Sequence, residues 1–375
     1  MAKRKATNME VKKSNRNQIF RYLCKNDNVS NPEIAYALKI SVPTVTQNTK
    51  ELIERGLVEE VGELESTGGR RAKGLAVVKN ACMAVGLDIT KNHIGLLLTN
   101  LIGEILKYER ISIPYQSGEE YYYQVNRRLE QFLKESEIDK NRLLGIGISF
   151  PGIVNLQQGK ITYSHILEVK DLPFDEVSKY FEYPCFFLND ANAGAFAEGL
   201  QLEESERFFY LSLSNSVGGA IYSEKKLIQG KEFRCGEVGH MTLVPDGCTC
   251  YCGKKGCMDA YCSAKILANY TNGKLEKFFE KLELGDPGAK KLWKEYTAYL
   301  AAAINNIHMV LDCDIILGGY VGSFTRIYIS DIWRKVYERN TFEEMIPFIR
   351  AGAYGMETSA LGAALKVMEQ FVEDV

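Results

Sequence analysis

The residues with the clearest chemistry lie in one cysteine-rich stretch, residues 235–263, which holds six of the ten cysteines. One imidazole nitrogen and three thiolates form the ligand set of a closed structural zinc site, in which four protein ligands leave no position for a catalytic water. Gly253 and Gly256 supply the tight turns that bring neighbouring cysteines to one ion. The spacing therefore predicts a structural Zn²⁺ in the loop 240–257, with these ligands: His240, Cys250, Cys252 and Cys257.

Two other interpretations of these cysteines are unligated thiols and disulfides. The basic N-terminus has no apolar segment behind it, and no apolar run approaches the roughly 18 residues of a membrane span. We therefore expect a cytoplasmic protein without a membrane partner. Disulfides are rare in that compartment, and clustered Cys and His residues there usually bind metal, which favours zinc. Cys248 and Cys262 fall outside the predicted ligand set.

A second chemical feature is the pair Asn189 and Asp190, which follows the apolar run C-F-F-L. We expect a buried strand to enter a helix at this point, at the edge of a crevice between two units. An amide and a carboxylate placed there can donate to and accept from neighbouring sugar hydroxyls. The alternative is that Asp190 only caps the helix that follows.

The elements that position these groups begin with a head of opposite charge to the rest of the chain. Residues 1–75 contain 14 Lys and Arg against 9 Asp and Glu, whereas the other 300 contain 32 against 39. The overall composition, 46% hydrophobic and 25% charged, is ordinary for a soluble protein of two or three domains. A basic head suggests a nucleic-acid partner for the head alone, and a solvated lysine-rich tail is the alternative.

Three short helices are predicted in the head. Apolar residues recur at helical spacing in residues 15–26, Ser30 and Glu33 form a capping box for a second helix, and Ser41 caps a third that ends at Gly56. This is the helix-turn-helix arrangement, and residues 57–78 then alternate like a hairpin. The third helix is expected to bury four apolar side chains: Val42, Val45, Leu52 and Ile53.

The third helix is the predicted DNA-reading element. Short polar side chains at its N-terminus can reach base edges in the major groove: Thr44, Thr46, Gln47, Asn48 and Lys50. The hairpin tip, with Gly69, Arg70 and Arg71, forms a basic wing for backbone or minor-groove contact. A helical protein-interaction module is the alternative, but helix-turn-helix, wing and basic tail together favour DNA.

Beyond about residue 80 the pattern changes to α/β. The predicted strands cover 81–90, 93–100, 104–114 and 143–150, with a helix over 118–136. A second unit repeats the pattern with strands 208–215, 219–223 and 314–317 and helices 286–311 and 356–369. Two such units facing each other enclose a cleft, the usual place for a ligand.

Several motifs, in order along nearly the whole chain, carry a family resemblance. They are S-T-G-G-R-R (66–71), G-I-G-I-S-F-P-G-I-V (145–154), N-D-A-N-A-G-A (189–195), G-E-V-G-H (236–240), the C-x-C-x-x-x-x-C loop and I-I-L-G-G (315–319). The chain resembles the ROK family of repressors and sugar kinases. The resemblance implies a winged helix-turn-helix over residues 1–78 and a two-lobed α/β body over 79–375, with the actin-like ATPase and sugar kinase (ribonuclease H-like) fold.

The resemblance also implies site residues. Asp190 corresponds to the family's kinase base, while Glu237 and His240 would reach the sugar, the histidine also holding zinc. Asp259 stands where the family commonly has a glutamate, one methylene longer, and a solvated loop carboxylate is its alternative. Pro151 and Gly152 would line the sugar pocket, although a turn that closes a core strand is equally ordinary.

The chain departs from the family's kinases at both phosphate loops. Kinases carry D-I-G-G-T-K and G-T-G-x-G-G, whereas this chain has D-I-T-K-N-H at 88–93 and S-N-S-V-G-G at 214–219. Glycine allows backbone amides to approach phosphate oxygens, so its loss disfavours ATP binding. We therefore expect no catalytic residue and a vestigial role for Asp190.

The predicted function is a sugar-responsive DNA-binding regulator of carbohydrate metabolism genes, with repression as the family's usual sign. Its expected partners are operator DNA, a sugar or sugar phosphate, and further copies of itself in a dimer or tetramer. One alternative is an active ROK-type hexose kinase with a fused DNA-binding head. Another is a sugar-independent regulator whose body serves only as a dimer scaffold.

Overall fold

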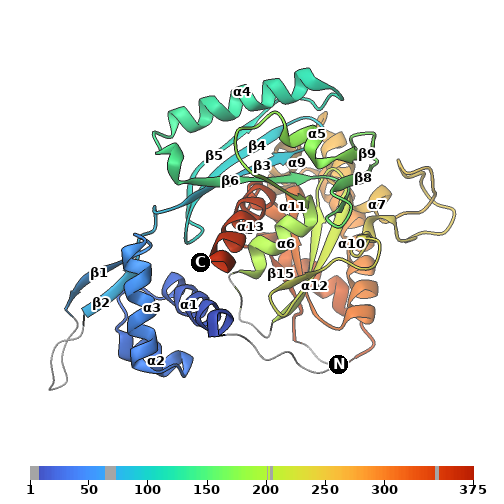
Figure 1. Ribbon diagram of the computed structural model, residues 1–375. Coiled ribbons are helices and arrows are strands. Elements are labelled where there is room, and N and C mark those ends of the chain that lie inside the picture. Colours follow the sequence, from blue (N-terminus) through green and yellow to red (C-terminus); the bar gives the residue numbers. More distant parts are fainter. Residues whose placement is uncertain (1–7, 64–72, 201, 203–205, 343–345) are drawn as a thin grey trace.

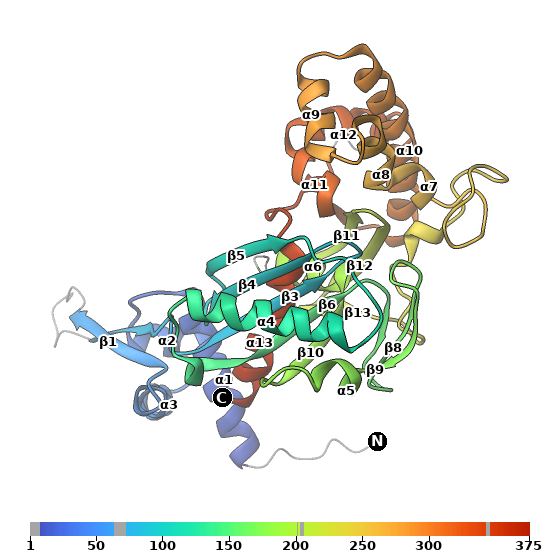
Figure 2. The ribbon, with the colours of Figure 1, turned by 90° about the horizontal axis from the view of Figure 1, so that it is seen from above.

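A computed structural model describes residues 8–63, 73–200, 202, 206–342 and 346–375, and Figures 1 and 2 show it in two views. The head consists of α1 (Asn8–Lys25), α2 (Asn31–Leu38), α3 (Val42–Glu54) and the antiparallel strands β1 (Val58–Glu63) and β2 (Lys73–Val77). The predicted helix-turn-helix and hairpin are therefore confirmed. The predicted wing residues Gly69, Arg70 and Arg71 lie outside the described residues.

The helix boundaries of the head follow from its caps. Ser30 and Glu33 form the predicted reciprocal capping box, and the Ser41 hydroxyl accepts the N–H of Thr44. The first helix begins at Asn8, before the apolar pattern that predicted it, and its early charged residues pair with α3. Lys12 and Arg16 both contact the carboxylate of Glu51.

The body contains two five-stranded sheets of the same topology. The first sheet has the order β10-β6-β3-β4-β5, in which β3, β4 and β5 run antiparallel and β6 and β10 join in parallel. Its strands are β3 (Met83–Ile89), β4 (Ile94–Asn100), β5 (Ile105–Ile111), β6 (Leu143–Phe150) and β10 (Cys185–Asn189). Helix α4 (Glu119–Glu135) covers its outer face (Figure 1).

The second sheet repeats this order as β13-β12-β11-β14-β15. Its strands are β11 (Arg207–Leu213), β12 (Val217–Ser223), β13 (Lys226–Ile228), β14 (Asp314–Gly318) and β15 (Ile349–Ala351). As in the first sheet, the three strands of a meander are joined by two parallel strands, which confirms the predicted duplication. An additional small sheet, which no sequence pattern predicted, contains β7 (Ile153–Asn155), β8 (Lys160–Ser164) and β9 (Val169–Pro173).

Two helices lie between the sheets: α6 (Asp190–Gly199) against the second sheet and α13 (Thr358–Asp374) against the first (Figure 1). The approach of α13 is close because the strands carry glycine beneath it. A Cβ at Gly86 would lie 1.8 Å from the Ala360 carbonyl oxygen, and one at Gly147 would lie 1.9 Å from that of Ala363. Any larger residue at these positions would push α13 off the sheet.

The remaining helices form the outer part of the second lobe, which extends away from the head in Figure 2. They are α7 (Asp259–Cys262), α8 (Ala264–Ala268), α9 (Leu275–Glu283), α10 (Pro287–Leu311), α11 (Gly319–Thr325) and α12 (Ile329–Tyr337), while the short α5 (Phe174–Ser178) belongs to the first lobe. Among the described residues, no helix is both long enough and apolar enough to cross a membrane.

The head docks on the C-terminal end of α13, and both views place that end beside α1 (Figures 1 and 2). Apolar side chains of the head, such as Phe20 and Leu23, belong to the same buried cluster as Leu365 and Val372 of α13. The polar contacts include Lys13 with the Asp374 carboxylate (3.2 Å) and Asn17 Nδ2 to the Glu373 carbonyl (2.9 Å). Arg16 and Arg55 both donate to the Val375 carbonyl (2.8 Å for Arg55). Cationic donors at a helix C-terminus also interact favourably with the helix dipole.

Candidate functional site

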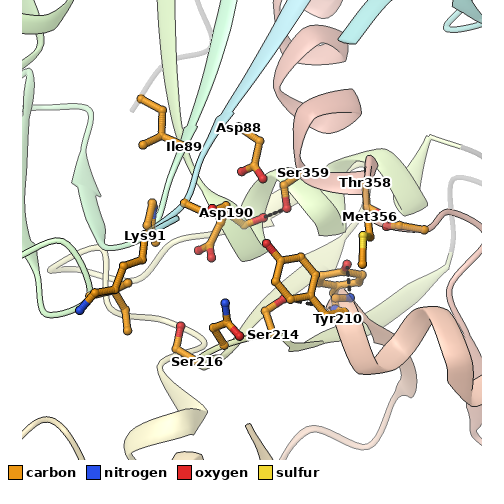
Figure 3. A pocket seen from close by; sticks show the side chains of 17 residues that line it. Asp88, Ile89, Lys91, Asp190, Tyr210, Ser214, Ser216, Met356, Thr358 and Ser359 are labelled. Atoms are coloured by element: carbon orange, nitrogen blue, oxygen red, sulfur yellow. Dashed lines mark hydrogen bonds between the residues drawn. The ribbon is translucent and has the colours of Figure 1, made fainter. Parts of the chain in front are cut away.

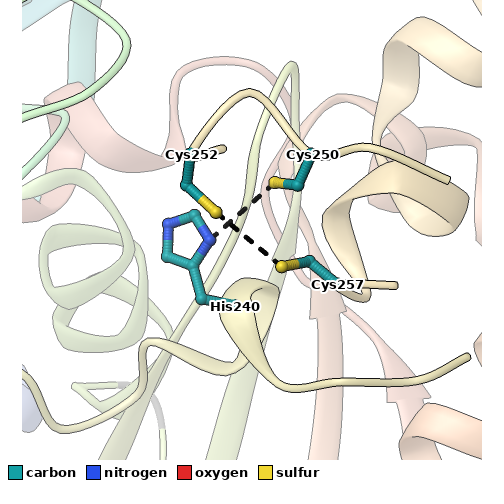
Figure 4. Close-up of side chains that lie close together, drawn as sticks. All are labelled: His240, Cys250, Cys252 and Cys257. Atoms are coloured by element: carbon teal, nitrogen blue, oxygen red, sulfur yellow. Dashed lines mark hydrogen bonds between the residues drawn. The ribbon is translucent and has the colours of Figure 1, made fainter. Parts of the chain in front are cut away.

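The predicted metal ligands come together in space, although they span 18 residues of sequence (Figure 4). One donor atom from each of His240, Cys250, Cys252 and Cys257 lies within 4.8 Å of all the others. The Cys252 and Cys257 sulfurs are 3.8 Å apart, and His240 Nδ1 is 4.0 Å from the Cys250 sulfur. Sulfurs bound to one tetrahedral zinc at about 2.3 Å would be about 3.8 Å apart, so the arrangement fits this ion.

The loop folds back on itself through local hydrogen bonds and one close backbone approach. The Cys250 N–H donates to the Lys254 carbonyl at 2.8 Å, and the Gly253 N–H returns to the Cys250 carbonyl at 3.0 Å. Gly256 has a positive φ of 80°, and a Cβ there would lie 1.8 Å from the Val244 carbonyl oxygen. Glycine is therefore required at this turn.

A cleft cavity of about 470 Å³ lies next to the metal cluster, between the β7–β8 segment and the metal loop. Six of the predicted sugar-binding residues line it: Pro151, Gly152, Asn189, Asp190, Glu237 and His240. They come from both lobes, since Pro151 and Gly152 follow β6 whereas Glu237 precedes, and His240 ends, a 3₁₀ turn over Val238–His240. The structure thus brings together residues separated by up to 89 positions.

Asp259 does not line this cavity, contrary to its prediction as a sugar-binding residue. It is buried, and its carboxylate accepts the Val217 N–H at 2.6 Å. The short side chain on α7 thus reaches the backbone at the start of β12 instead of the cleft. Because Val217 and Gly218 line the cavity, Asp259 positions the wall without touching its interior.

Asn189 holds the polar end of the cavity together. Its Oδ1 accepts the Asn192 N–H at 3.0 Å, so Asn189, and not Asp190, is the N-cap of α6. Its Nδ2 donates to Asp190 Oδ1 at 2.9 Å and to the Gly152 carbonyl at 3.0 Å. The alternative interpretation of Asp190 as a cap is therefore wrong, which leaves its carboxylate facing the cleft.

Burial dominates the electrostatics of the cleft carboxyls. It raises the pKa of Asp190 to about 6, partly offset by the Ala191 N–H. Burial and the neighbouring Asp190 charge raise the pKa of Glu237 to about 7, against the lowering effect of Arg234. Asp88, which accepts a hydrogen bond from the Ser149 hydroxyl at 2.7 Å, also has its pKa raised to about 7 by burial.

A second, much smaller cavity of about 50 Å³ lies where the two predicted phosphate-loop positions meet (Figure 3). It is lined by Asp88–Lys91 from the first turn and Ser214–Ser216 from the second, and Asp190 belongs to both cavities. The backbone amides at the start of α11 already have partners here. The Gly319 N–H donates to the buried Tyr210 hydroxyl at 3.2 Å, and the Tyr320 N–H to the Ser214 hydroxyl at 3.4 Å.

On the head, the structure separates the predicted DNA-binding residues. Thr46, Gln47 and Lys50 are exposed on α3, and Thr44 is half-buried. Asn48 is buried, with 1% of its surface exposed, and its Nδ2 donates to the Thr44 carbonyl at 2.7 Å. Its predicted exposure is therefore wrong, because its position on α3 faces the head's interior.

The apolar face of α3 also differs from its prediction at one end. Val45 and Leu52 are fully buried as predicted, while Ile53 is half-buried. Val42 is 44% exposed because it lies in the first turn, beyond the edge of the head's core.

Among the cleft residues that the sequence interpretation missed are four with aromatic or charged side chains: Tyr163, His165, Arg234 and Tyr251. Tyr163 and His165 lie on or after β8, in the small sheet that had no sequence signal. Tyr251 stands between two predicted zinc ligands, so its neighbours in sequence already placed it near His240. Its hydroxyl lies 3.5 Å from His240 Nε2, the ring nitrogen opposite the metal cluster.

The fold and the cleft define a two-lobed protein of the actin-like ATPase and sugar kinase class, with a winged helix-turn-helix head. The chain belongs to the ROK family, which its residues 84–370 match. Residues 14–59 match the winged helix-turn-helix DNA-binding family.

Individual relatives agree with this assignment. The chain is 27% identical to the xylose repressor of Bacillus spizizenii over 97% of each chain. It is 27% identical to the DNA-binding transcriptional dual regulator NagC of Escherichia coli over 66% of this chain and 62% of that protein. The fold also matches the crystal structure of a ROK family transcriptional regulator, a homologue of the E. coli MLC protein, with a TM-score of 0.76 and 23% identity over 97% of each chain.

Proposed function

We propose that this protein is a sugar-responsive DNA-binding regulator, acting as a repressor of carbohydrate metabolism genes. The observation that carries the proposal is the physical connection of a winged helix-turn-helix head to a cleft with sugar-binding chemistry through one helix, α13. The repressors named among its relatives support the same function. The head, residues 1–78, would bind the operator, and the body, residues 79–375, would bind the sugar.

Helix α13 provides the route between the two sites. At its first turn, Thr358 and Ser359 line the smaller cavity, and the Ser359 hydroxyl donates to the Asp190 carbonyl at 3.1 Å (Figure 3). Its other end carries the head contacts described above, about 25 Å away for a helix of this length. A sugar that moves Asp190 or closes the lobes would therefore shift the head. The sugar changes the balance between the open and closed arrangements of the lobes only if it binds one of them more tightly than the other.

The occupied amides at α11 support a regulator without kinase activity. A triphosphate needs free backbone N–H donors at such a helix start. Here the Tyr210 and Ser214 hydroxyls already accept hydrogen bonds from these N–H groups. The cavity at these turns is also small, at about 50 Å³ against about 470 Å³ for the neighbouring cleft cavity. We therefore regard Asp190 as a sugar ligand and not as a working base.

Zinc is the metal we propose for the four-residue cluster. Its role would be structural, since four protein ligands complete the tetrahedron. By fixing His240 and the loop that carries Tyr251, the ion would hold one wall of the cleft.

We further propose that the protein works in the cytoplasm as a homodimer or tetramer on a pseudo-palindromic operator. A single winged head reads a short half-site, and two heads related by two-fold symmetry would read two half-sites at a fixed spacing.

The head residues should divide into two groups in DNA binding. Gln47→Ala and Thr46→Ala are expected to lower discrimination between the operator and other sequences, with a loss of about 1–3 kcal/mol on the operator alone. Arg70→Ala and Arg71→Ala are expected to weaken binding to all DNA and to lower the salt dependence. Anisotropy titrations with operator and random DNA at several salt concentrations measure both effects. Equal losses on both DNAs for the two groups would contradict this division.

Sugar binding should depend on pH because the cleft carboxyls have raised pKa values. In the ligand-free protein, the folded state keeps protons that the unfolded chain has released, so these groups lower the free energy of unfolding as pH rises from about 4 to 7. A bound sugar increases the free energy of unfolding most when these carboxyls are ionised, because ionised Asp190 and Glu237 accept hydrogen bonds from its hydroxyls. The sugar-induced rise in Tm is therefore expected to be larger at pH 8 than at pH 5.5. A rise in Tm that is the same at both pH values would contradict this.

The route through α13 is tested by loosening its contact with the head. The double variant Arg16→Ala and Arg55→Ala is expected to bind sugar normally while the sugar's effect on operator affinity falls severalfold. Arg127→Ala, on the exposed face of α4, is the matched control and should respond normally. A full operator response in the double variant would exclude this route.

The proposed function is tested by two assays on the same preparation. Thermal shift with a panel of saccharides should find at least one that raises Tm, since a ligand that binds only the folded state stabilises it. A coupled assay for ADP release with the same saccharides and ATP should find no turnover. Turnover that Asp190→Asn abolishes would identify a kinase instead, and no stabilisation by any saccharide would leave the body as a scaffold.

A further inference from the structure

The cleft cavity is larger than its hydrogen-bonding end requires. Asp190 lies where the two cavities meet, and its charge acts on Glu237, so these two carboxyls lie close together. With Asn189 beside them, they can engage the hydroxyls of a single sugar ring. The whole cavity, at about 470 Å³, is in the range of pockets that hold drug-sized ligands, which leaves room beyond one ring.

Part of the remaining lining consists of exposed aromatic rings. Tyr163 is 39% exposed and Tyr251 is 42% exposed, and His165 is also exposed. The His165 ring centroid lies 4.3 Å from that of Tyr163 and 5.8 Å from that of Tyr251, with the ring planes at 82° and 70°. The three rings therefore form one aromatic wall with faces turned in different directions.

This aromatic wall joins the two lobes. Tyr163 and His165 come from the small sheet of the first lobe, whereas Tyr251 comes from the metal loop of the second. A ligand held between them would contact both sides of the cleft at once. Such a ligand would favour the closed arrangement of the lobes, since only there are both contacts made.

The chemistry of the wall suits a second sugar unit. One face of a pyranose ring is a patch of C–H groups, which is apolar and carries slight positive charge, and the face of an aromatic ring is apolar and negative. The hydroxyls around the rim of the same sugar need donors and acceptors. Arg234, which also lines the cavity, presents a guanidinium with several N–H donors for them.

We propose that the effector is a disaccharide, with one unit at Asn189, Asp190 and Glu237 and the other against the aromatic wall of Tyr163, His165 and Tyr251. This inference rests on the proposed function, because it specifies the class of sugar that the cleft binds. A single pentose or hexose would satisfy the carboxyls and leave the rings exposed to water.

The test is calorimetric titration of the zinc-loaded full-length protein with matched pairs of sugars. The pairs are xylose and xylobiose, glucose and cellobiose, and N-acetylglucosamine and N,N′-diacetylchitobiose. At least one disaccharide is expected to bind about tenfold more tightly than its own monosaccharide. Tyr163→Ala and Tyr251→Ala are each expected to lower the affinity for that disaccharide about fivefold or more. The affinity for the monosaccharide should fall by less than about twofold.

Two controls separate contact from folding. Tyr251 lies between zinc ligands, so the zinc content of its variant is measured, and Tyr163 provides an independent variant on the other lobe. Tyr123→Ala, at an exposed tyrosine of α4, should change neither affinity. Monosaccharides that bind as tightly as every disaccharide would overturn this inference while leaving the proposed function intact. If none of the six sugars binds, both are overturned.

Discussion

Replacement of Cys252 by serine is expected to remove the bound zinc and most of the response to sugar. A serine hydroxyl is a poor substitute for a thiolate, and structural zinc in small sites contributes about 10–16 kcal/mol of binding free energy. Without the ion, His240 and the segment that carries Tyr251 lose their common anchor at the edge of the cleft. Sugar affinity should fall by more than about tenfold, together with a fall in Tm.

The matched control is Cys248→Ser in the same loop. Cys248 is exposed and lies outside the four-residue cluster, so its variant should keep both zinc and sugar affinity. Elemental analysis and calorimetry on the two variants measure the difference. Full zinc content together with normal sugar binding in Cys252→Ser would show that the predicted metal site does not support sugar binding.

Replacement of Asp190 by asparagine should have the largest effect on the ligand itself. A hydrogen bond to a charged group contributes about 1.5–3 kcal/mol, so losing the charge is expected to weaken sugar binding by about 10- to 100-fold. The ligand-free protein should be no less stable at pH 8, because burial of an ionised Asp190 is unfavourable, as its raised pKa indicates. The variant therefore separates ligand binding from folding.

Glu232→Gln is the control for this variant, since Glu232 is an exposed carboxylate in the segment that leads to Glu237. Its affinity for sugar should be unchanged. Normal sugar affinity in Asp190→Asn would place the ligand outside the cleft.

The sequence was most informative where local chemistry decides the structure. The His and Cys cluster followed from ligand type and spacing, and the caps of α2 and α3 followed from Ser30, Glu33 and Ser41. Most strands of the two sheets followed from runs of apolar residues, because strands buried on both faces need them, whereas the three-residue strands β13 and β15 were not predicted. In each case, residues that are close in the sequence determine the local structure.

The errors arose where distant parts of the chain decide the outcome. Asn48 has the same kind of side chain as an exposed helix residue, and only the packing of the head as a whole shows that it is buried. Asp259 was assigned to the sugar by its place in a motif, whereas the position of β12 directs it to the Val217 amide. Tyr163 and His165 lie in a short sheet without an apolar pattern, so their place in the cleft required the fold.

The occupied amides at α11 could not be predicted either. The motif at 214–219 showed the loss of glycine, but the role of Tyr210 depends on strand β11 lying beside β14. The Tyr210 hydroxyl therefore occupies one backbone amide of this helix start through a contact that the sequence motif does not contain.

The most direct test of the central claim measures operator affinity with and without the sugar. An operator selected from random DNA would be titrated with the protein at fixed salt, alone and with the saccharide that raises its Tm most. We predict that the saccharide weakens operator binding by at least about tenfold, and that Asp190→Asn binds the operator normally without this response. Operator affinity that is unchanged by a saccharide shown to occupy the cleft would contradict the account.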